Sequence, residues 1–194
     1  MTYQVIYSSE SATPMQTEEL DEILQQARVS NAACGITGAL IYVDGVFLQI
    51  LEGEASTVQT LMARIARDVR HETVTVLKEG SLASATFSDW KMAYISATPE
   101  QVAEWAGLGC ANAAPAIPAI LTDLRRDPHS TAQLAEGILS ALRAAPTAQA
   151  KSGYLLGHPL LAGHHRQGSR PGGKDRGGVG RPVSVARVAG WTGG

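Results

Sequence analysis

The chain has 194 residues, of which 44% are hydrophobic, and this is enough for one domain of ordinary size with extensions. Its two cysteines, Cys34 and Cys110, are too few for a disulfide framework and stand in no metal-binding Cys/His spacing, so we expect a reducing compartment and no metal site. The N-terminal residues lack the basic and apolar segments of a signal peptide, and no apolar run reaches the length of a membrane span, about 18 residues. We therefore expect a cytoplasmic protein that does not cross a membrane.

Charge is distributed unevenly along the chain. Residues 1–98 hold 6 basic and 12 acidic side chains, residues 99–150 hold 3 and 5, and residues 151–194 hold 7 and 1. The net charge of −2 therefore combines an acidic body with a basic tail, which also contains 12 of the 20 glycines. We expect this tail to be disordered. Nucleic-acid binding is not expected of it, because it has no folded motif and only two aromatic residues, Tyr154 and Trp191.

The first two predicted elements are a strand and a helix. Val5, Tyr7 and Ser9 alternate with their neighbours, which predicts a strand from about Tyr3 to Ser9. Thr17 precedes two acidic residues, as an N-cap does when acids follow it at the positive end of the helix dipole. Apolar residues at helical spacing extend this predicted helix from Thr17 to roughly residue 30.

A hairpin is predicted around Asp44-Gly45. An Asp-Gly pair suits a type I′ turn because both central residues need a positive φ. The flanking side chains alternate as half-buried strands do: Ile36, Leu40 and Tyr42 before the turn, and Phe47, Gln49 and Leu51 after it. Gln49 lies in an otherwise apolar run, so its amide is expected to be buried and to need hydrogen-bond partners.

A second helix and two further strands complete this part of the chain. Ser56 and Gln59 have the spacing of a capping box, which predicts a helix that ends near Arg70-His71. A fourth strand is predicted from Val74, and a fifth runs through Trp90, Met92 and Tyr94. The resulting α+β order, βαββαββ, predicts a ferredoxin-like fold with a five-stranded mixed sheet. Its two helices would cover one face of the sheet, and a ligand could lie between them.

Three helical segments follow residue 98, over about residues 101–108, 116–126 and 131–143, with Ser130 as the expected cap of the last one. Helices this short are marginal alone, so we expect them to pack on the sheet or on another subunit. The sequence thus predicts a domain over residues 1–98, a helical extension over 99–150 and a Gly/Arg-rich tail over 151–194.

Several residues are candidates for a functional site, although each has an ordinary structural interpretation when taken alone. A buried tyrosine or tryptophan is usually a core residue, an asparagine near a helix end is usually a cap, and charged residues at helical spacing usually form a solvated face. These residues are Tyr7, Asn31, Gln49, Arg64, Asp68, His71, Trp90 and Met92. No Walker loop, GxSxG or HExxH motif accompanies them.

Taken together, these residues resemble the BLUF family of blue-light sensors that use FAD. The similarity covers residues 3 to 96, in the order and spacing of the family. The matching stretches are Ile6-Tyr7-Ser8-Ser9, Ala27-Arg28 with Asn31, GITGALIY from Gly35 to Tyr42, Gly45 to Gln49 with Leu51-Glu52-Gly53, Arg64 with Asp68 and Arg70-His71, and Phe87 to Met92.

The resemblance implies a noncovalent FAD between the two helices, with FMN and riboflavin as open alternatives. It implies that Tyr7 donates an electron to the excited flavin and that Gln49 bridges the Tyr7 hydroxyl to the flavin ring. Asn31 would bond the pyrimidine edge of the ring, and Arg64, Asp68 and His71 would line the flavin pocket. Trp90 and Met92 would report the change to the rest of the protein, one or the other of them approaching Gln49.

Three hypotheses about function follow. The first is a short photoreceptor that is not an enzyme, forms a homo-oligomer and signals through a separate downstream protein. The second is a flavin-dependent oxidoreductase that uses the same pocket for turnover. The third is a ferredoxin-like interaction module without a cofactor, which would leave the buried amide of Gln49 unexplained.

Overall fold

The computed structural model describes residues 1–109, 115–144 and the backbone of 154–156. These residues belong to one compact unit, Met1–Leu161, and the second unit, Ala162–Gly194, lies outside the described part. The disorder predicted for residues 151–194 therefore concerns residues that are not described, apart from the short strand at 154–156. Among the described residues, no helix has both the length and the apolar character needed to cross a bilayer.

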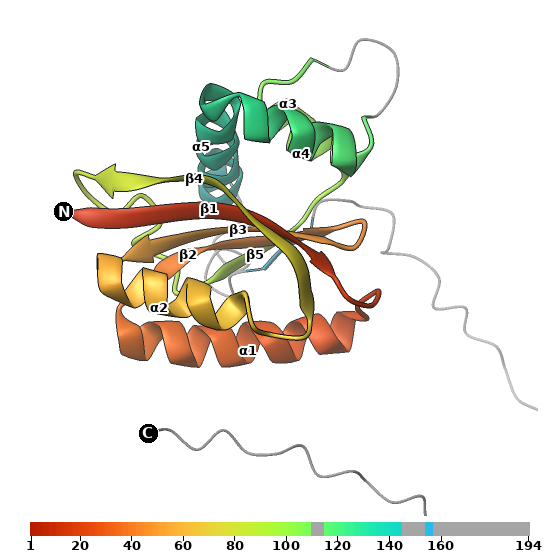
Figure 1. Cartoon of the computed structure of the whole chain (residues 1–194). Helices are drawn as coiled ribbons and strands as arrows, with labels where there is room; N and C mark the ends of the chain where they lie inside the picture. The colour runs from red at the N-terminus through yellow and green to blue at the C-terminus, as the bar shows by residue number, and fades with distance from the viewer. Residues whose placement is uncertain (110–114, 145–153, 157–194) are drawn as a thin grey trace, which may run out of the picture. The chain divides into compact units, whose positions relative to one another are not determined.

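A mixed β-sheet forms the centre of the molecule (Figure 1). Its strands lie in the order β4-β1-β3-β2-β5-β6, with antiparallel pairs up to β2 and parallel pairs from β2 to β6. The predicted five-stranded mixed sheet is confirmed, whereas β6 was not predicted. The strands are β1 Thr2–Ser11, β2 Thr37–Val43, β3 Val46–Gly53, β4 His71–Leu82, β5 Ala93–Ser96 and β6 Tyr154–Leu156.

The predicted hairpin joins β2 to β3. Asp44 and Gly45 both have positive φ, 49° and 78°, as the type I′ turn requires. At the other end of the hairpin, Gly38 allows the two backbones to approach closely, since a Cβ there would lie 1.9 Å from the Ile50 carbonyl oxygen. The hairpin register sets Gln49 opposite Leu40 on one side and opposite Tyr7 on the other.

Helix α1, Thr17–Cys34, starts one residue before the position that the predicted Thr17 cap would give, and it ends later than predicted. Its N-cap is Gln16, whose backbone N–H donates to Glu19 Oε2 at 2.9 Å, so Thr17 is the first helical residue and not the cap. The helix ends at Gly35, which adopts the left-handed conformation at φ 67°. Asn31 is therefore inside the helix, and the interpretation of Asn31 as a C-terminal cap is wrong.

Helix α2, Ala55–Ile65, is shorter than predicted. Glu54 caps it by accepting a hydrogen bond from the Thr57 backbone N–H at 3.0 Å, in place of the predicted Ser56 box. The chain then turns through residues 66–70, where Asp68 accepts a bond from the Arg70 backbone N–H at 3.0 Å. Because this side chain stabilises a turn, the helix does not continue to His71.

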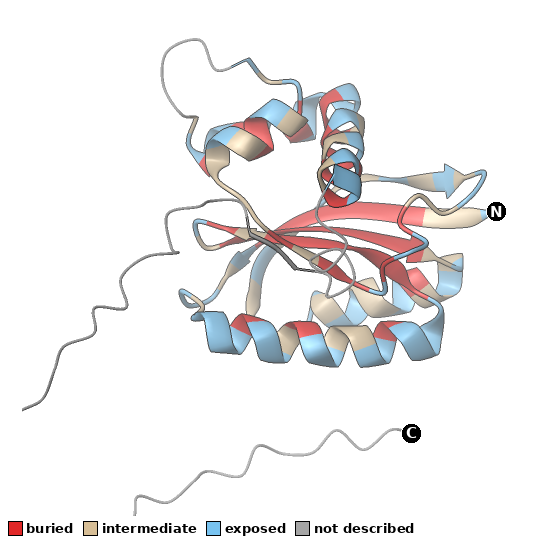
Figure 2. Cartoon of the chain, turned by 180° about the vertical axis from the view of Figure 1, so that it is seen from behind, coloured by how far each residue is buried: buried red, intermediate tan, exposed pale blue. Residues whose placement is uncertain are grey.

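Two layers of helices cover the two faces of the sheet (Figure 1). Helices α1 and α2 pack on the face that contains Val5, Tyr7 and Leu51. The opposite face, with Ile6 and Ile50, is covered by α3 Pro99–Trp105, α4 Ile117–Arg126 and α5 Pro128–Ala144. Figure 2 shows the buried strands between these layers and the exposed outer side of α1. The C-terminal helices thus pack on the sheet, one of the two arrangements that we expected.

Candidate functional site

Tyr7 and Gln49 form the centre of the candidate site. They are cross-strand partners on β1 and β3, and the Tyr7 hydroxyl donates a hydrogen bond to Gln49 Oε1. Tyr7 is fully buried and Gln49 is 8% exposed. Burial raises the pKa of Tyr7 well above its ordinary value, and the negative charge of Asp68 raises it further. The phenol is therefore protonated at neutral pH and acts as the donor in this pair.

The NH₂ group of the Gln49 amide contacts Met92. Gln49 Nε2 donates to Met92 Sδ at 3.2 Å, and Met92 is 1% exposed. This contact decides between the two residues that were expected to approach Gln49. A thioether sulfur is a weak acceptor, so the amide has a buried partner that a stronger acceptor could replace.

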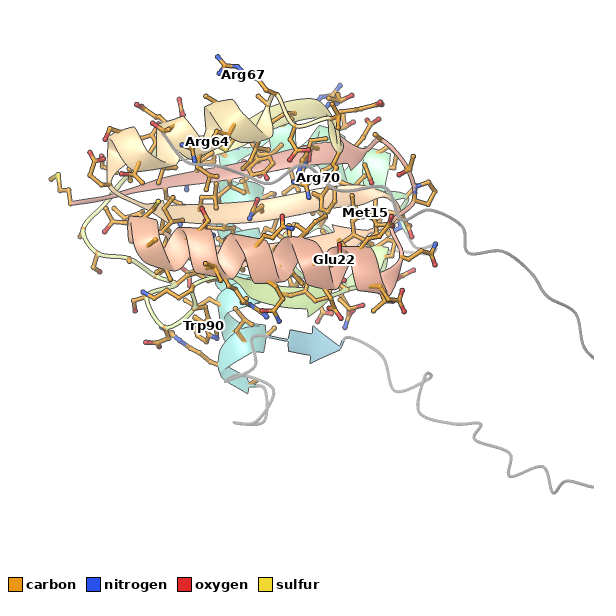
Figure 3. The ribbon with its side chains drawn as sticks, turned by 90° about the horizontal axis from the view of Figure 1, so that it is seen from below. Met15, Glu22, Arg64, Arg67, Arg70 and Trp90 are labelled. Carbon is orange, nitrogen blue, oxygen red and sulfur yellow. The ribbon has the colours of Figure 1, made fainter. Side chains whose placement is uncertain are left out.

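Trp90 lies on the other side of the sheet from Gln49. Its indole packs in the core with the C-terminal helices, with its ring centroid 6.4 Å from that of Phe87. In Figure 3 it is seen beyond α1, on the side away from α2. Trp90 and Met92 were predicted to lie on the fifth strand, but β5 begins only at Ala93. The segment before the strand is irregular, so side chains two positions apart do not share a face.

Helix α1 holds the segment next to Met92. Arg28 Nε donates to the Met92 carbonyl oxygen at 3.0 Å, and Asn31 Nδ2 approaches the Lys91 carbonyl oxygen at 3.4 Å. Asn31 is 3% exposed, and its side-chain bond is longer than the usual N–H···O range. The Asn31 amide therefore retains capacity for a ligand beside α1.

Asp68, Arg70 and His71 lie together at the start of β4. Arg70 pairs with the Asp68 carboxylate at 2.5 Å, and this hydrogen bond lowers the pKa of Asp68. His71 Nδ1 lies 2.8 Å from Ser9 Oγ, and its ring centroid is 4.7 Å from that of Phe47. Burial lowers the pKa of His71, while the Asp68 charge opposes that shift. A neutral imidazole therefore lines this end of the site.

The predicted helix face of Arg64, Asp68 and His71 does not exist as such. Only Arg64 is on α2, because the helix ends at Ile65, and the other two residues reach the site from the turn and from β4. Arg64 is exposed. Figure 3 shows Arg64 and Arg70 on the side of α2 toward α1, whereas Arg67 projects away.

Sequence reasoning missed Glu52, which is fully buried on β3. Its carboxylate accepts hydrogen bonds from Gln4 and from the segment before β5. Glu52 directly follows the largely apolar run from Val46 to Leu51. A single acid at the end of such a strand is the signal that could have revealed it, since a buried carboxylate needs several hydrogen-bond donors.

Comparison with known proteins bears on what this arrangement does. The sequence model of one family, described as "BLUF: Sensors of blue-light using FAD", matches residues 2–93. Residues 2–93 belong to the BLUF family. The BLUF domain of this chain is thus a blue-light sensor domain of a flavin-using family, and it contains every predicted site residue.

Relatives of this BLUF domain occur in larger proteins. Subunit beta of the photoactivated adenylate cyclase of Euglena gracilis is 38% identical over 98 residues, which are 50% of this chain and 11% of that protein. Subunit alpha of the same organism is 41% identical over 68 residues, 35% of this chain and 7% of that protein. The chain thus spans a small part of the curated relatives that it matches.

Solved structures share the fold. The dark-state structure of the BLUF protein BlrB is 24% identical with a TM-score of 0.57, and the match covers 72% of this chain and 96% of that one. The photo-activated state of BlsA is 28% identical with a TM-score of 0.52, covering 65% and 93%. The similarity to BlrB supports the ferredoxin-like fold with C-terminal helices.

The residues on the α1–α2 face fit a flavin ring. Gln49 Nε2 is bonded to a weak acceptor and Asn31 Nδ2 makes a long bond, so both buried amides can take a ligand that offers better partners. The carbonyl and imide edge of a flavin offers such acceptors and donors side by side. Tyr7 remains bonded to the other end of the Gln49 amide.

Proposed function

We propose that this chain is a blue-light photoreceptor that binds FAD noncovalently between α1 and α2 and signals to a separate protein. The observation that carries the proposal is the buried series Tyr7 Oη to Gln49 Oε1 and Gln49 Nε2 to Met92 Sδ. It links a phenol, an amide that both donates and accepts, and the segment that leads into β5. Such a series can convert a transient change at Tyr7 into a lasting change of hydrogen bonds.

The residues that would hold the cofactor lie on the α1–α2 side of the sheet. We assign Gln49 and Asn31 to the polar edge of the ring, and Arg64, Asp68 and His71 to the lining of the site. Two of these are held in place by neighbours, since Asp68 is paired with Arg70 and His71 is bonded to Ser9. When bound, the flavin supplies the absorption of blue light and an excited state that is a strong oxidant.

In this proposal Tyr7 would donate an electron to the excited flavin and would also release its hydroxyl proton. A phenol that loses an electron becomes a strong acid, and its proton can follow the existing hydrogen bond to Gln49 Oε1. The Gln49 amide then rearranges so that its donor and acceptor ends change partners, and Nε2 leaves the Met92 sulfur. Electron and proton return to Tyr7 at charge recombination, so the net result is a different bond pattern.

Signalling rather than turnover is supported by how the polar groups are used. The two side chains suited to acid–base chemistry, Tyr7 and His71, are both engaged in buried or half-buried hydrogen bonds. We therefore propose that the chain is not an enzyme and acts in the cytoplasm on a downstream protein. Its C-terminal helices, which cover the second face of the sheet, are the proposed surface for that partner and for a homo-oligomer.

The test is a visible absorption spectrum of the purified protein before and after a blue flash, with extraction of the bound cofactor to identify the flavin. The wild type and an exposed control on α1, Gln26→Leu, are expected to show a small reversible red shift. Gln49→Leu should bind flavin without the shift. A flavin-bound wild type without a shift, or a Gln49→Leu variant with the full shift, would refute the proposal.

A further inference from the structure

Glu52 connects three separate parts of the chain through one buried carboxylate. Its Oε1 accepts a bond from Gln4 Nε2 at 2.8 Å, and its Oε2 accepts the backbone N–H groups of Thr86 at 2.8 Å and Phe87 at 2.9 Å. The Thr86 hydroxyl also donates to Oε1. The side chain is fully buried, so all these donors lose their best acceptor if the carboxylate is removed.

The segment that Glu52 holds, residues 86–92, is here named the output strap. It has no regular strand pairing and lies between the end of β4 at Leu82 and the start of β5 at Ala93. Its position is set instead by hydrogen bonds to neighbours. Besides those to Glu52, the Trp90 carbonyl oxygen accepts from the Gly38 N–H at 3.1 Å, and the Met92 carbonyl oxygen accepts from Arg28 Nε at 3.0 Å.

The output strap takes part in both layers of the molecule. Phe87 and Trp90 pack in the core shared with the C-terminal helices, while Met92 packs in the core shared with Tyr7. Glu52 holds the end that faces the C-terminal helices, and Gln49 contacts the other end through Met92. With the Glu52 end held, a change at Met92 would be passed on toward the C-terminal helices, whereas a loose Glu52 end would let the strap absorb that change locally.

We propose that Glu52 is a positioning residue for the light response: it fixes the output strap so that the Met92 sulfur meets the Gln49 amide. This inference rests on the proposed function, because it assigns Glu52 a role in the recovery of the dark state. In the structure the strap presents the Met92 sulfur as an acceptor, and we assign this contact to the dark state. Loosening the Glu52 end lowers the tendency of the Gln49 amide to return to that partner after light.

Three substitutions separate the positioning role of Glu52 from the simple burial of a polar group. Glu52→Ala leaves the Thr86 and Phe87 N–H groups without their acceptor. Glu52→Gln keeps one acceptor oxygen for them, and Gln4 can rotate its amide to meet the new NH₂ group. Thr86→Val keeps the side-chain shape and removes only the hydroxyl bond, so it is a mild test if Glu52→Ala fails to fold.

The first readout is the dark recovery of the flavin band in the wild type and in a Met92→Ala background. Glu52→Ala is expected to slow recovery roughly fivefold and Thr86→Val about twofold, the scale of single hydrogen bonds. Both effects should vanish in Met92→Ala, and Glu52→Gln should stay within about twofold of the wild type. Equal slowing in both backgrounds would overturn the proposal, since it would mean that Glu52 acts independently of Met92.

The second readout needs no photochemistry and separates this inference from the proposed function. In the dark, the ¹³C-methyl NMR signal of Met92 should move in Glu52→Ala, while the signals of Met15 and Met62 stay in place. The control is Glu79→Gln, an exposed carboxylate that accepts from Tyr3 at 2.7 Å, which should leave all three unchanged. An unmoved Met92 signal in Glu52→Ala would refute the proposal that Glu52 positions the output strap. A wild type without a red shift would refute only the photocycle.

Discussion

Met92→Leu tests which residue of the output strap reports the state of Gln49. Leucine conserves the volume of methionine, so the packing cost at this fully buried position should stay below about 1.5 kcal/mol. The substitution removes the sulfur that accepts from Gln49 Nε2 at 3.2 Å. It therefore isolates one hydrogen bond that we assign to the dark state.

The size of the effect follows from that bond. A buried hydrogen bond contributes about 1 kcal/mol, which corresponds to a factor of about five in a rate. Because the bond is proposed to be present in the dark and absent after light, its loss should slow dark recovery by up to this factor. The assay is the decay of the red-shifted flavin band after a flash, measured at one temperature for all variants.

Trp90→Phe is the matched control from the same strap. Trp90 packs against Phe87 among the C-terminal helices, away from Gln49, so this variant should recover at nearly the wild-type rate. The reasoning fails if Trp90→Phe slows recovery as much as Met92→Leu does. It also fails if Met92→Leu leaves the rate unchanged.

Three further predictions concern the stability of the fold. Gly38→Ala should lower the thermal midpoint severely, because its Cβ would meet the Ile50 carbonyl oxygen at 1.9 Å, whereas Gly80→Ala, which has open space around it, should change little. The free energy of unfolding, measured by urea titration, should fall as the pH drops from 7.5 to 5.5, because burial holds the pKa of His71 below its unfolded value of about 6.5 and the unfolded chain then binds more protons. His71→Gln should flatten that slope, and the same slope persisting in His71→Gln would contradict the assignment. Asp127→Ala should lower the thermal midpoint by a few degrees, since Asp127 accepts the His129 N–H at 2.9 Å at the start of α5, and an unchanged midpoint would show that this cap contributes nothing.

The sequence predicted the strands better than the helix ends. The hairpin was predictable because Asp44-Gly45 needs a rare backbone conformation and the alternation on both sides agrees with it. All three predicted caps were wrong by one to three residues: Gln16, Glu54 and Asp127 cap in place of Thr17, Ser56 and Ser130. Several polar side chains near each helix start can reach an N–H group, and the sequence does not show which of them does.

The end of α2 was missed for a different reason. No glycine or proline interrupts the sequence between Ile65 and His71, so periodicity alone extends the helix. The turn is made by the Asp68 side chain, which accepts both the N–H and the guanidinium of Arg70. Such a side-chain interaction is a property of the folded geometry rather than of the residue pattern.

The buried pair at the centre of the candidate site was predictable from the sequence, whereas the placement of Trp90 and Met92 was not. Tyr7 and Gln49 lie on regular strands, so the period of two fixes which side chains share a face with each of them. The register between β1 and β3 then sets the two residues opposite each other. Trp90 and Met92 precede β5 in an irregular segment, where that rule does not apply. The strand β6 gave no signal at all, because three residues are too few for periodicity to appear.

The alternation along β3 places its side chains in two different layers of the molecule. Phe47 and Leu51, like Gln49, point to the side of α1 and α2, and Leu48 and Ile50 point to the C-terminal helices. If the flavin lies on the side of α1 and α2 as proposed, a substitution scan along this strand should sort by parity, with odd positions altering the flavin absorption band and even positions other than Glu52 altering the packing of the C-terminal helices. A single inserted residue would exchange the two roles along the strand. Apart from Glu52, substitutions on this strand can therefore alter the proposed flavin side or the side of the C-terminal helices one at a time, which an insertion cannot do.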